Sequence, residues 1–441
     1  MVRSRGFAHG ARGVRARLPR PAGGAAIVAA LALSLGAAPG LANGAEPGTA
    51  KEAVPAAAMG AVAADAPPSA SDAPAFDADE VARILAHGPW PPQPSARPRD
   101  PSNSVSGNPD AVAFGRILFF DARLSANGAV SCASCHRPEL GFTDGRARAQ
   151  GLGLHDRNTQ GLSDLAWQRW FGRDGGADSL WAAAIRPMLA AHEMGADPAL
   201  LARVVSRDDA LGRDYRTLFG APAGDEQTMV NLAKAIASYV ESLVSPATPF
   251  DAFRDALARG DAAAASRYPA AARRGLKIFL GPGRCGICHV GPSFTNGEFH
   301  DVGIPFIVAP GRVDPGRYAG IRRLRDDPYN LVSRFNDQAR PVDAIDDSAL
   351  KTRTVTLSQR NWGEWKVPGL RNLAATGPYM HDGSKASLRD VVRHYSDLNE
   401  DRLHADGEAI LRPLHLTERE IDDLVAFLES LSPSPAKPSS R

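Results

Sequence analysis

The stretch Ser131-Cys132-Ala133-Ser134-Cys135-His136 contains the pattern Cys-x-x-Cys-His, which returns at Cys285-Gly286-Ile287-Cys288-His289. In c-type haem proteins the two thiols of this pattern add to the haem vinyl groups, and the histidine becomes an axial ligand of the iron. The chain has four cysteines, and the two motifs use all of them. A four-cysteine zinc site or two disulfides would use the same thiols, but neither explains a histidine after each pair. The sequence therefore predicts two covalently bound haems, with His136 and His289 as iron ligands.

The N-terminus has the features of an export signal. Residues 1 to about 24 carry six arginines and no acidic residue, and a short apolar run follows at residues 25–38. That run is too short to span a membrane, and small residues behind it offer cleavage sites after Ala42 or Ala45. We interpret residues 1–45 as a secretory signal peptide, with an uncleaved anchor as the alternative. Export together with covalent haem predicts a periplasmic protein that has no membrane span after cleavage.

The charge balance argues against a nucleic-acid partner. Removal of residues 1–45 takes away six of the 51 basic residues and none of the 49 acidic ones, so the formal net charge changes from +2 to −4. Proteins that bind nucleic acid usually carry a basic surface, and this chain shows no sign of one. The length of 441 residues leaves room for two or three domains.

The sequence around the two haem motifs repeats. A helix expected at residues 110–120 precedes the first motif, and one expected at residues 271–280 precedes the second. Each has a glycine four residues before a phenylalanine, which places both on one helix face, where the glycine allows a second helix to approach closely. The sequence after each motif also repeats, as GFTDG at residues 141–145 and SFTNG at residues 293–297.

These repeats predict an all-α fold of two cytochrome-c-like haem modules, with extra helices and long loops. We expect a disordered, Pro-rich tether at residues 46–106, an N-terminal module at residues 107–262 and a C-terminal module at residues 263–434. Residues 309–361 are polar and are expected to form a long loop. Thr417 and Glu420 form the pattern of a capping box at the start of a last amphipathic helix.

With both motifs placed, the chain resembles the bacterial di-haem cytochrome c peroxidase superfamily over roughly residues 107–432. The resemblance rests on five blocks, which are FFDARLS at 119–125, RNT at 157–159, DSLW at 178–181, LRNL at 370–373 and TGPYMHDG at 376–383. Within this superfamily the end of the chain is similar to the MauG/MbnH branch, whose members oxidise tryptophan in partner proteins.

The resemblance implies that the N-terminal haem, bound at His136, reacts with hydrogen peroxide. In the family, a glutamate six residues after a proline moves a proton between the two peroxide oxygens. Here that pair is Pro187 and Glu193, and a surface glutamate at a helix end is the alternative. We interpret His155 as a loop or propionate-side histidine rather than an iron ligand, and His192 as a residue near the site or on the surface.

The resemblance also implies that the C-terminal haem, bound at His289, transfers electrons. In the family its sixth ligand lies seventeen residues after the proline of a Thr-x-Pro stretch, which leads here from Pro378 to Tyr395. Ordinary peroxidases have methionine at this place and the MauG/MbnH branch has tyrosine, whose phenolate favours high oxidation states of iron. A packing tyrosine is the alternative, and Met380 is a competing ligand at an unusual position.

A calcium ion between the haems is a further implication of the resemblance. The Asn158 side chain and the carbonyls of Thr376 and Pro378 would hold it, with waters completing the shell. One departure lies nearby, since Arg173 stands where the family has a tryptophan that relays electrons. A fixed cation cannot relay an electron hole and opposes the movement of positive charge past it. A second departure is Ala183, which replaces a glutamine of the family.

The function expected from these features is that of a periplasmic di-haem peroxidase that uses hydrogen peroxide to oxidise a partner protein. An ordinary cytochrome c peroxidase, supplied with electrons by a small cytochrome or cupredoxin, is the alternative, and Tyr395 argues against it. A di-haem electron carrier is the alternative from another class, and Glu193 in an open pocket argues against that.

Overall fold

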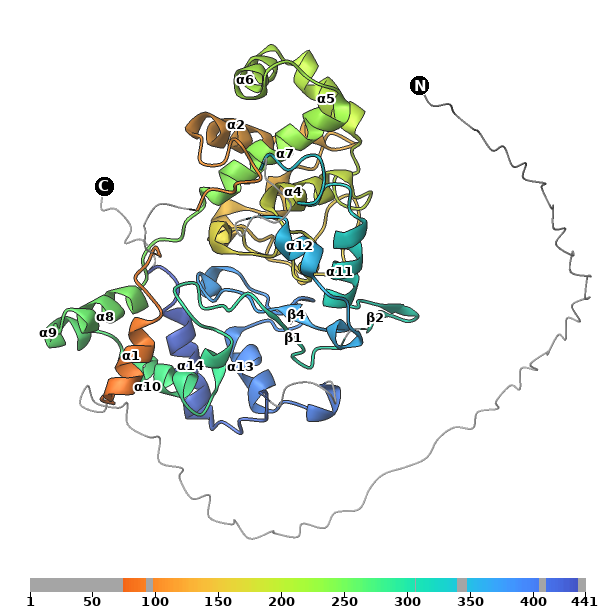
Figure 1. Ribbon diagram of the computed structural model, residues 1–441. Coiled ribbons are helices and arrows are strands. Elements are labelled where there is room, and N and C mark those ends of the chain that lie inside the picture. The colour runs from red at the N-terminus through yellow and green to blue at the C-terminus, as the bar shows by residue number, and fades with distance from the viewer. Residues whose placement is uncertain (1–73, 93–97, 306, 339–346, 404–409, 435–441) are drawn as a thin grey trace, which may run out of the picture. The chain divides into compact units, whose positions relative to one another are not determined.

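The computed structural model describes residues 74–92, 98–305, 307–338, 347–403 and 410–434 (Figure 1). The predicted signal peptide, residues 1–45, and the first part of the predicted tether lie outside these ranges. Within the described ranges, no helix is both long enough and apolar enough to cross a membrane.

The described part of the chain is mainly helical, which confirms the predicted fold class. Its α-helices are α1 (Ala78–Leu85), α2 (Pro109–Phe120), α3 (Cys132–Cys135), α4 (Leu180–Leu189), α5 (Pro198–Arg207), α6 (Asp209–Phe219), α7 (Asp225–Glu241), α8 (Pro249–Ala258), α9 (Ala262–Ala265), α10 (Ala270–Leu280), α11 (Arg317–Asp326), α12 (Leu350–Thr354), α13 (Leu388–Ser396) and α14 (Glu418–Glu429). Short 3-10 helices lie at Ala122–Leu124, Pro138–Leu140, Leu165–Trp167, Cys285–Ile287, Gln359–Asn361, Leu373–Ala375 and Glu400–Arg402.

Two small antiparallel sheets complete the described elements. Strand β1 (Phe299–His300) pairs with β4 (Trp365–Lys366), and β2 (Ile307–Ala309) pairs with β3 (Arg312–Val313). In the first sheet His300 faces Trp365. This pairing brings a segment just after the second haem motif beside the residues that precede the LRNL block.

The first hydrophobic cluster is built around α7, on which α2, α4 and α5 pack (Figure 1). Every residue of α7 from Thr228 to Glu241 is buried. The Lys234 ammonium is buried there because it donates to the Phe335 carbonyl and to the Asp337 carboxylate, at 2.7 and 2.6 Å. A segment from the second half of the chain is thereby fixed to the first haem module.

The second hydrophobic cluster is built around the pair α10 and α14, with α8 and α13 beside them. Helix α14 begins with the predicted capping box, in which Thr417 and Glu420 exchange side-chain and backbone hydrogen bonds. Its Ile421 and Leu424 are buried against α10. The two cores each carry one haem motif, since Cys132 packs on the first cluster and Cys285 on the second.

The glycines that precede the two motifs make close helix crossings, as predicted. A Cβ atom on Gly115 of α2 would lie 1.9 Å from the Ala235 carbonyl oxygen of α7. A Cβ atom on Gly275 of α10 would lie 2.0 Å from the Asp423 carbonyl oxygen of α14. The same crossing therefore holds each motif-bearing segment against its core helix.

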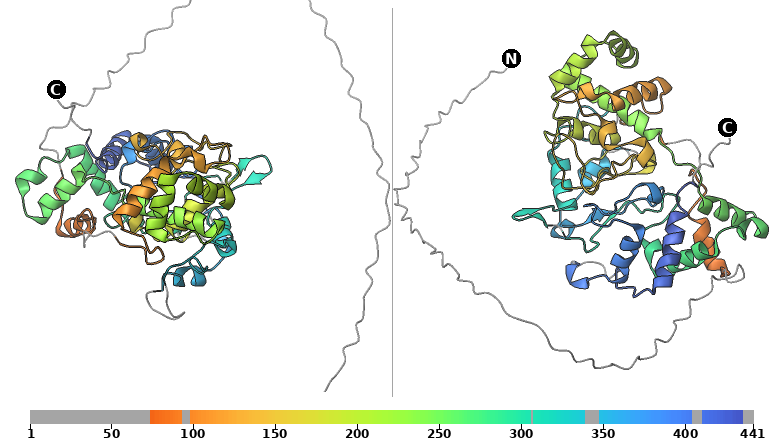
Figure 2. Two further views of the ribbon diagram at one scale, coloured as in Figure 1. Left: turned by 90° about the horizontal axis from the view of Figure 1, so that it is seen from above. Right: turned by 180° about the vertical axis from the view of Figure 1, so that it is seen from behind.

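Part of the stretch predicted as a tether, residues 46–106, is folded. Helix α1 begins with a capping box at Asp77 and Glu80, and its Ile84 is buried in the second cluster. It lies beside α8 and α10 in the views of Figures 1 and 2. The buried Trp90 indole donates to the Ser245 carbonyl at 2.9 Å. The Ala- and Pro-rich composition concealed these few large apolar side chains, which bind the segment to the core.

Candidate functional site

The two motif histidines make the same hydrogen bond. His136 Nδ1 lies 3.0 Å from the Phe142 carbonyl oxygen, and His289 Nδ1 lies 2.9 Å from the Phe294 carbonyl oxygen. A carbonyl oxygen can only accept, so Nδ1 carries the proton and the Nε2 lone pair is left for a metal. Burial lowers the pKa of both histidines, which favours the same neutral form. Metal-bound histidines are usually oriented in this way.

The phenylalanines that accept these bonds have an unusual backbone. Phe142 has φ 60° and Phe294 has φ 53°, in the left-handed region. This conformation costs an L-residue about 1–2 kcal/mol. The cost recurs at equivalent places in both modules, next to the imidazole that the carbonyl holds. The repeated strain therefore supports a functional role for the two histidines.

All four cysteines of the chain lie in the described part, and all are free thiols. The two pairs belong to different clusters, so they do not form one four-cysteine zinc site. Burial raises the pKa of Cys132 and of Cys285 to about 12, and the pKa of Cys135 to about 11. Zinc is bound by thiolates, which these environments disfavour. Both observations are consistent with two haem-attachment sites.

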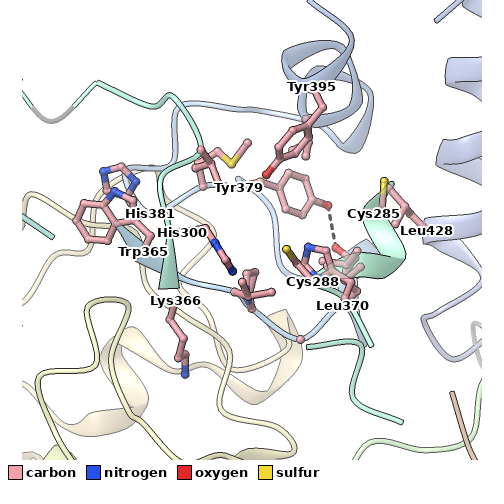
Figure 3. A pocket seen from close by; sticks show the side chains of 18 of the residues that line it. Cys285, Cys288, His300, Trp365, Lys366, Leu370, Tyr379, His381, Tyr395 and Leu428 are labelled. Carbon is pink, nitrogen blue, oxygen red and sulfur yellow. Dashed lines mark hydrogen bonds between the residues drawn. The ribbon is translucent and has the colours of Figure 1, made fainter. Parts of the chain in front are cut away.

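A cavity of about 550 Å³ lies beside the second motif (Figure 3). Such a volume is typical of small-molecule and cofactor sites. Cys285, Cys288 and His289 line it, and much of the remaining wall is apolar, with Phe279, Val302, Leu388, Val391, Val392, Leu424 and Leu428. Two thiols and an imidazole in an apolar cavity fit a covalently bound haem.

Tyr395 enters this cavity from α13 (Figure 3). A capping box at Ser387 and Asp390 starts the helix, and the buried Leu388 and Val392 hold it against the second cluster. Burial raises the pKa of Tyr395 above its usual range, and the nearby motif thiols add to the shift. Among the described residues, its hydroxyl has no hydrogen-bond partner. Tyr395 is half-buried and its side chain lines the cavity, so its oxygen is available as an iron ligand.

Two other side chains in the cavity are possible rivals for that role. Met380 lines the same cavity. Tyr379 lines it as well, but its hydroxyl donates to the Leu373 carbonyl at 2.8 Å and is thereby occupied (Figure 3). Met380 and the imidazoles of His300 and His381 therefore remain, beside Tyr395, as side chains of this cavity that could bind iron.

In the first module, Glu193 lies in the turn that follows α4. The Met194 N–H donates to the Pro187 carbonyl at 3.1 Å, and the Glu193 N–H donates to the Ala190 carbonyl at 2.9 Å. The Glu193 carbonyl accepts from Leu152 N–H at 3.0 Å. The structure thus links the predicted pair Pro187 and Glu193 through one turn and fixes that turn from two sides.

The turn brings two histidines to Glu193. One ligand atom from each of His155, His192 and Glu193 lies within 4.8 Å of the others, and the two imidazole centroids are 4.4 Å apart. Glu193 lies near the first motif, since its charge acts on Cys132, Cys135 and His136. Sequence spacing gave no sign that His155 and His192 meet; only the fold brings their two loops together.

The predicted calcium ligands do not fit a calcium ion. The Asn158 Oδ1 atom accepts from Arg173 Nη2 at 2.5 Å, so the only side-chain oxygen of that set is already occupied by a guanidinium. Thr376 and Pro378 line the cavity beside the second motif, as Arg173 does. The structure therefore brings the predicted ligands into one region but places a fixed cation among them.

A buried ion-pair network includes Asp174, the residue that follows Arg173 in the chain. Arg157 donates to Asp174 and to Asp314, each at 2.6 Å, and its guanidinium lies 4.9 Å from the Trp365 ring centroid. Trp365 stacks on His381 with centroids 3.6 Å apart (Figure 3). Burial alone would raise the pKa of Asp174, but the surrounding arginines hold it well below its usual range. No short motif of the sequence indicates this network, because its members are far apart in the chain.

Comparison with known proteins identifies the family. The family described as di-haem cytochrome c peroxidase matches residues 109–259. The chain is 36% identical to the methylamine utilization protein MauG of Methylorubrum extorquens, with 78% of this chain and 84% of the relative covered. It is 34% identical to the cytochrome-c peroxidase IdrP1 of Denitromonas iodatirespirans, with 78% and 86% covered.

Solved structures agree with this. A MauG-like protein associated with microbial copper homeostasis has a TM-score of 0.57 at 25% identity, with 78% of this chain and 96% of that chain covered. The di-haem peroxidase BthA from Burkholderia thailandensis has a TM-score of 0.59 at 23% identity, which supports the fold alone, and the alignment covers 76% and 89%. Since MauG and IdrP1 both exceed 30% identity over most of the chain, this protein belongs to the di-haem cytochrome c peroxidase family of oxidoreductases.

Proposed function

We propose that this chain is a periplasmic di-haem peroxidase that uses hydrogen peroxide to oxidise a partner protein. The observation that carries the proposal is Tyr395, whose hydroxyl enters the cavity of the second motif without a hydrogen-bond partner among the described residues. Tyr395 would supply an oxygen ligand, which favours oxidised iron, whereas a methionine ligand would favour reduced iron. A site with tyrosine would therefore be suited to hold the oxidising equivalents that peroxide supplies until a partner is oxidised.

We assign the reaction with peroxide to residues 107–262 and electron transfer to residues 263–434. The first haem would be held by Cys132, Cys135 and His136, and the second by Cys285, Cys288, His289 and Tyr395. Bound haem supplies the redox chemistry with peroxide. The protein supplies fixed neutral imidazoles, since each His Nδ1–H is held by a backbone carbonyl.

Glu193 is proposed to carry a proton between the two peroxide oxygens. General acid–base groups of this kind contribute about 10²–10⁴-fold to rates. The backbone hydrogen bonds of Glu193 to Ala190 and Leu152 fix the main chain from which the carboxylate extends. His155 and His192 flank it within 4.8 Å, so an imidazole can hand a proton to the carboxylate or accept one from it.

The cavity of the second motif also contains positive charge. Arg173 and Lys366 both line it. Burial, with Arg173 as the next cause, lowers the pKa of Lys366 to about 7. A carboxylate placed beside these side chains would restore the charged form of Lys366. The two cations are therefore suited to offset the carboxylates of a haem.

An ordinary cytochrome c peroxidase is the second candidate. Met380 lines the same cavity, and relatives named cytochrome-c peroxidase match the chain nearly as well as MauG does. In this reading a small cytochrome or cupredoxin would supply electrons for the reduction of peroxide. A di-haem electron carrier would not need Glu193 and its two histidines at the first motif.

The test uses the holoprotein with both haems, incubated with proteins of its native periplasm, with and without hydrogen peroxide. We expect mass spectrometry to find a partner protein with an oxidised aromatic residue only in the presence of peroxide. The Tyr395→Met variant should lose this product. If no partner is modified, and a reduced small cytochrome or cupredoxin instead sustains peroxide turnover, the ordinary peroxidase is the correct assignment.

A further inference from the structure

We propose that Arg173 is a built-in cation that replaces the calcium ion expected between the two haem sites, so that this chain needs no calcium. The predicted ligands were the side chain of Asn158 and the carbonyls of Thr376 and Pro378. Arg173 is bonded to the first of these and lines the same cavity as the other two. The inference concerns a metal site and does not depend on which substrate the peroxidase oxidises.

Both oxygens of Asn158 face Arg173. Nη2 donates to the Asn158 side-chain oxygen at 2.5 Å, and Nε donates to the Asn158 backbone oxygen at 3.4 Å. A guanidinium has five N–H donors in a planar fork, so it can bind several oxygens at once as a metal ion would. The oxygens available here are uncharged amide and carbonyl oxygens, which can bind either a guanidinium or a calcium ion.

The orientation of the Asn158 amide is fixed by its other contacts. Its Nδ2 donates to the Arg146 carbonyl at 2.7 Å, and its backbone N–H donates to the His381 carbonyl at 2.8 Å. A flipped amide would place Nδ2 against the guanidinium of Arg173 and Oδ1 against the Arg146 carbonyl. Asn158 therefore cannot turn its oxygen away from Arg173 toward a metal without losing two hydrogen bonds.

The charges around Arg173 also disfavour calcium. The described residues give Arg173 no carboxylate ion pair; Asp382 acts on it only from a distance. Its neighbour Arg157 is neutralised by Asp174 and Asp314. A guanidinium stays charged at neutral pH. A divalent ion would meet this fixed charge, and no carboxylate of the described residues pairs directly with Arg173 to offset it.

The consequence is a difference in dependence on the medium. A bound calcium ion dissociates when its concentration falls or a chelator is added, whereas a side-chain guanidinium does not. The guanidinium also contributes one positive charge, where a calcium ion would contribute two. The structure of the inter-haem region should thus be independent of calcium in this chain.

The test measures bound calcium in the holoprotein, purified in calcium-containing buffer and dialysed, by elemental analysis. We expect the wild type to hold far less than one calcium per chain, with a thermal midpoint and haem absorption spectrum that EGTA leaves unchanged. Arg173→Ala frees Asn158 Oδ1 and should bind about one calcium, which raises its thermal midpoint. Arg173→Lys keeps a cation and should bind none. Arg169→Ala removes an exposed arginine nearby and should behave as the wild type.

Two results would overturn the inference. One is a wild type with one calcium per chain whose removal by EGTA lowers the thermal midpoint. The other is an Arg173→Ala protein that folds and carries both haems but takes up no calcium, because Arg173 would then not occupy a cation site. If Arg173→Ala does not fold, the calcium content of the wild type and of Arg173→Lys still decides the question.

Discussion

Replacement of Glu193 by glutamine tests the proposed proton carrier. Glutamine has the same size, and the turn is held by backbone bonds to Ala190 and Leu152 that the substitution leaves intact, so the fold and both haems should remain. The variant loses the proton acceptor. Loss of such a group slows a reaction by about 10²–10⁴-fold, which corresponds to about 3–5 kcal/mol in the barrier.

The structure places the expected loss within that range. Because His155 and His192 lie within 4.8 Å of the carboxylate, an imidazole can take over part of the proton transfer. We therefore expect about a 10²-fold loss for Glu193→Gln alone, and a loss closer to 10⁴-fold when His155→Ala is added.

The assay is stopped-flow absorption of the oxidised holoprotein mixed with hydrogen peroxide, which follows the Soret band. Glu139→Gln is the matched control, because Glu139 is an exposed glutamate in the same module. It should react at the wild-type rate. A Glu193→Gln protein that carries both haems and reacts at an unchanged rate would refute the proposed proton transfer. Glu193 would then be a surface glutamate at a helix end.

Three further predictions concern the framework. Gly275→Ala should destabilise the fold by about 1–3 kcal/mol or more in chemical denaturation, since its Cβ would lie 2.0 Å from the Asp423 carbonyl oxygen. Cys132→Ala with Cys135→Ala should lower the intact mass by about one haem. The fold should lose stability in acid, because burial lowers the pKa of His87 from 6.5 to about 4. His87→Phe should lose less stability, which chemical denaturation between pH 6.5 and about 4 would measure.

Gly286→Ala meets its first neighbour at an ordinary 3.5 Å and should be nearly neutral; an equal effect at both glycines would contradict the crossing argument. The low pKa of His87 is caused first by burial, and the positive charge of Arg371 adds to the shift. As the pH falls, the unfolded chain therefore binds the proton first, so stability decreases below about pH 6.5 and levels off below about 4. The full effect is about 3 kcal/mol. Equal acid sensitivity of the wild type and His87→Phe would contradict the role of His87. An unchanged mass after loss of the first cysteine pair would contradict haem attachment at that pair.

The features that could be predicted from the sequence are those encoded by short spacings. Each of these features depends on residues that are only a few positions apart in the chain. They are the two Cys-x-x-Cys-His motifs, the helix crossings at Gly115 and Gly275, and the capping box of α14. The structure contains them where the spacing indicated. Local chemistry decides such features, so the remainder of the fold does not have to be known.

The features that could not be predicted depend on contacts between distant segments. The bond between Arg173 and Asn158 gives no signal in either segment, and the meeting of His155 with His192 requires two loops to be placed by the core. The polar stretch expected as a long loop contains α11, whose Gly320 packs on the backbone of Asp174. Charged sequence concealed that helix because its partners are buried charges.

The central claim is that Tyr395 binds the iron of the second haem, and the direct measurement is a redox titration with near-infrared and paramagnetic resonance spectra of the wild type and Tyr395→Met. A phenolate stabilises ferric iron, so the variant should have a higher reduction potential at this haem and a changed low-spin signal, while peroxide still reacts at the first haem. Identical signals and potentials in both proteins would contradict the claim, and Met380 would then be the better candidate for the ligand.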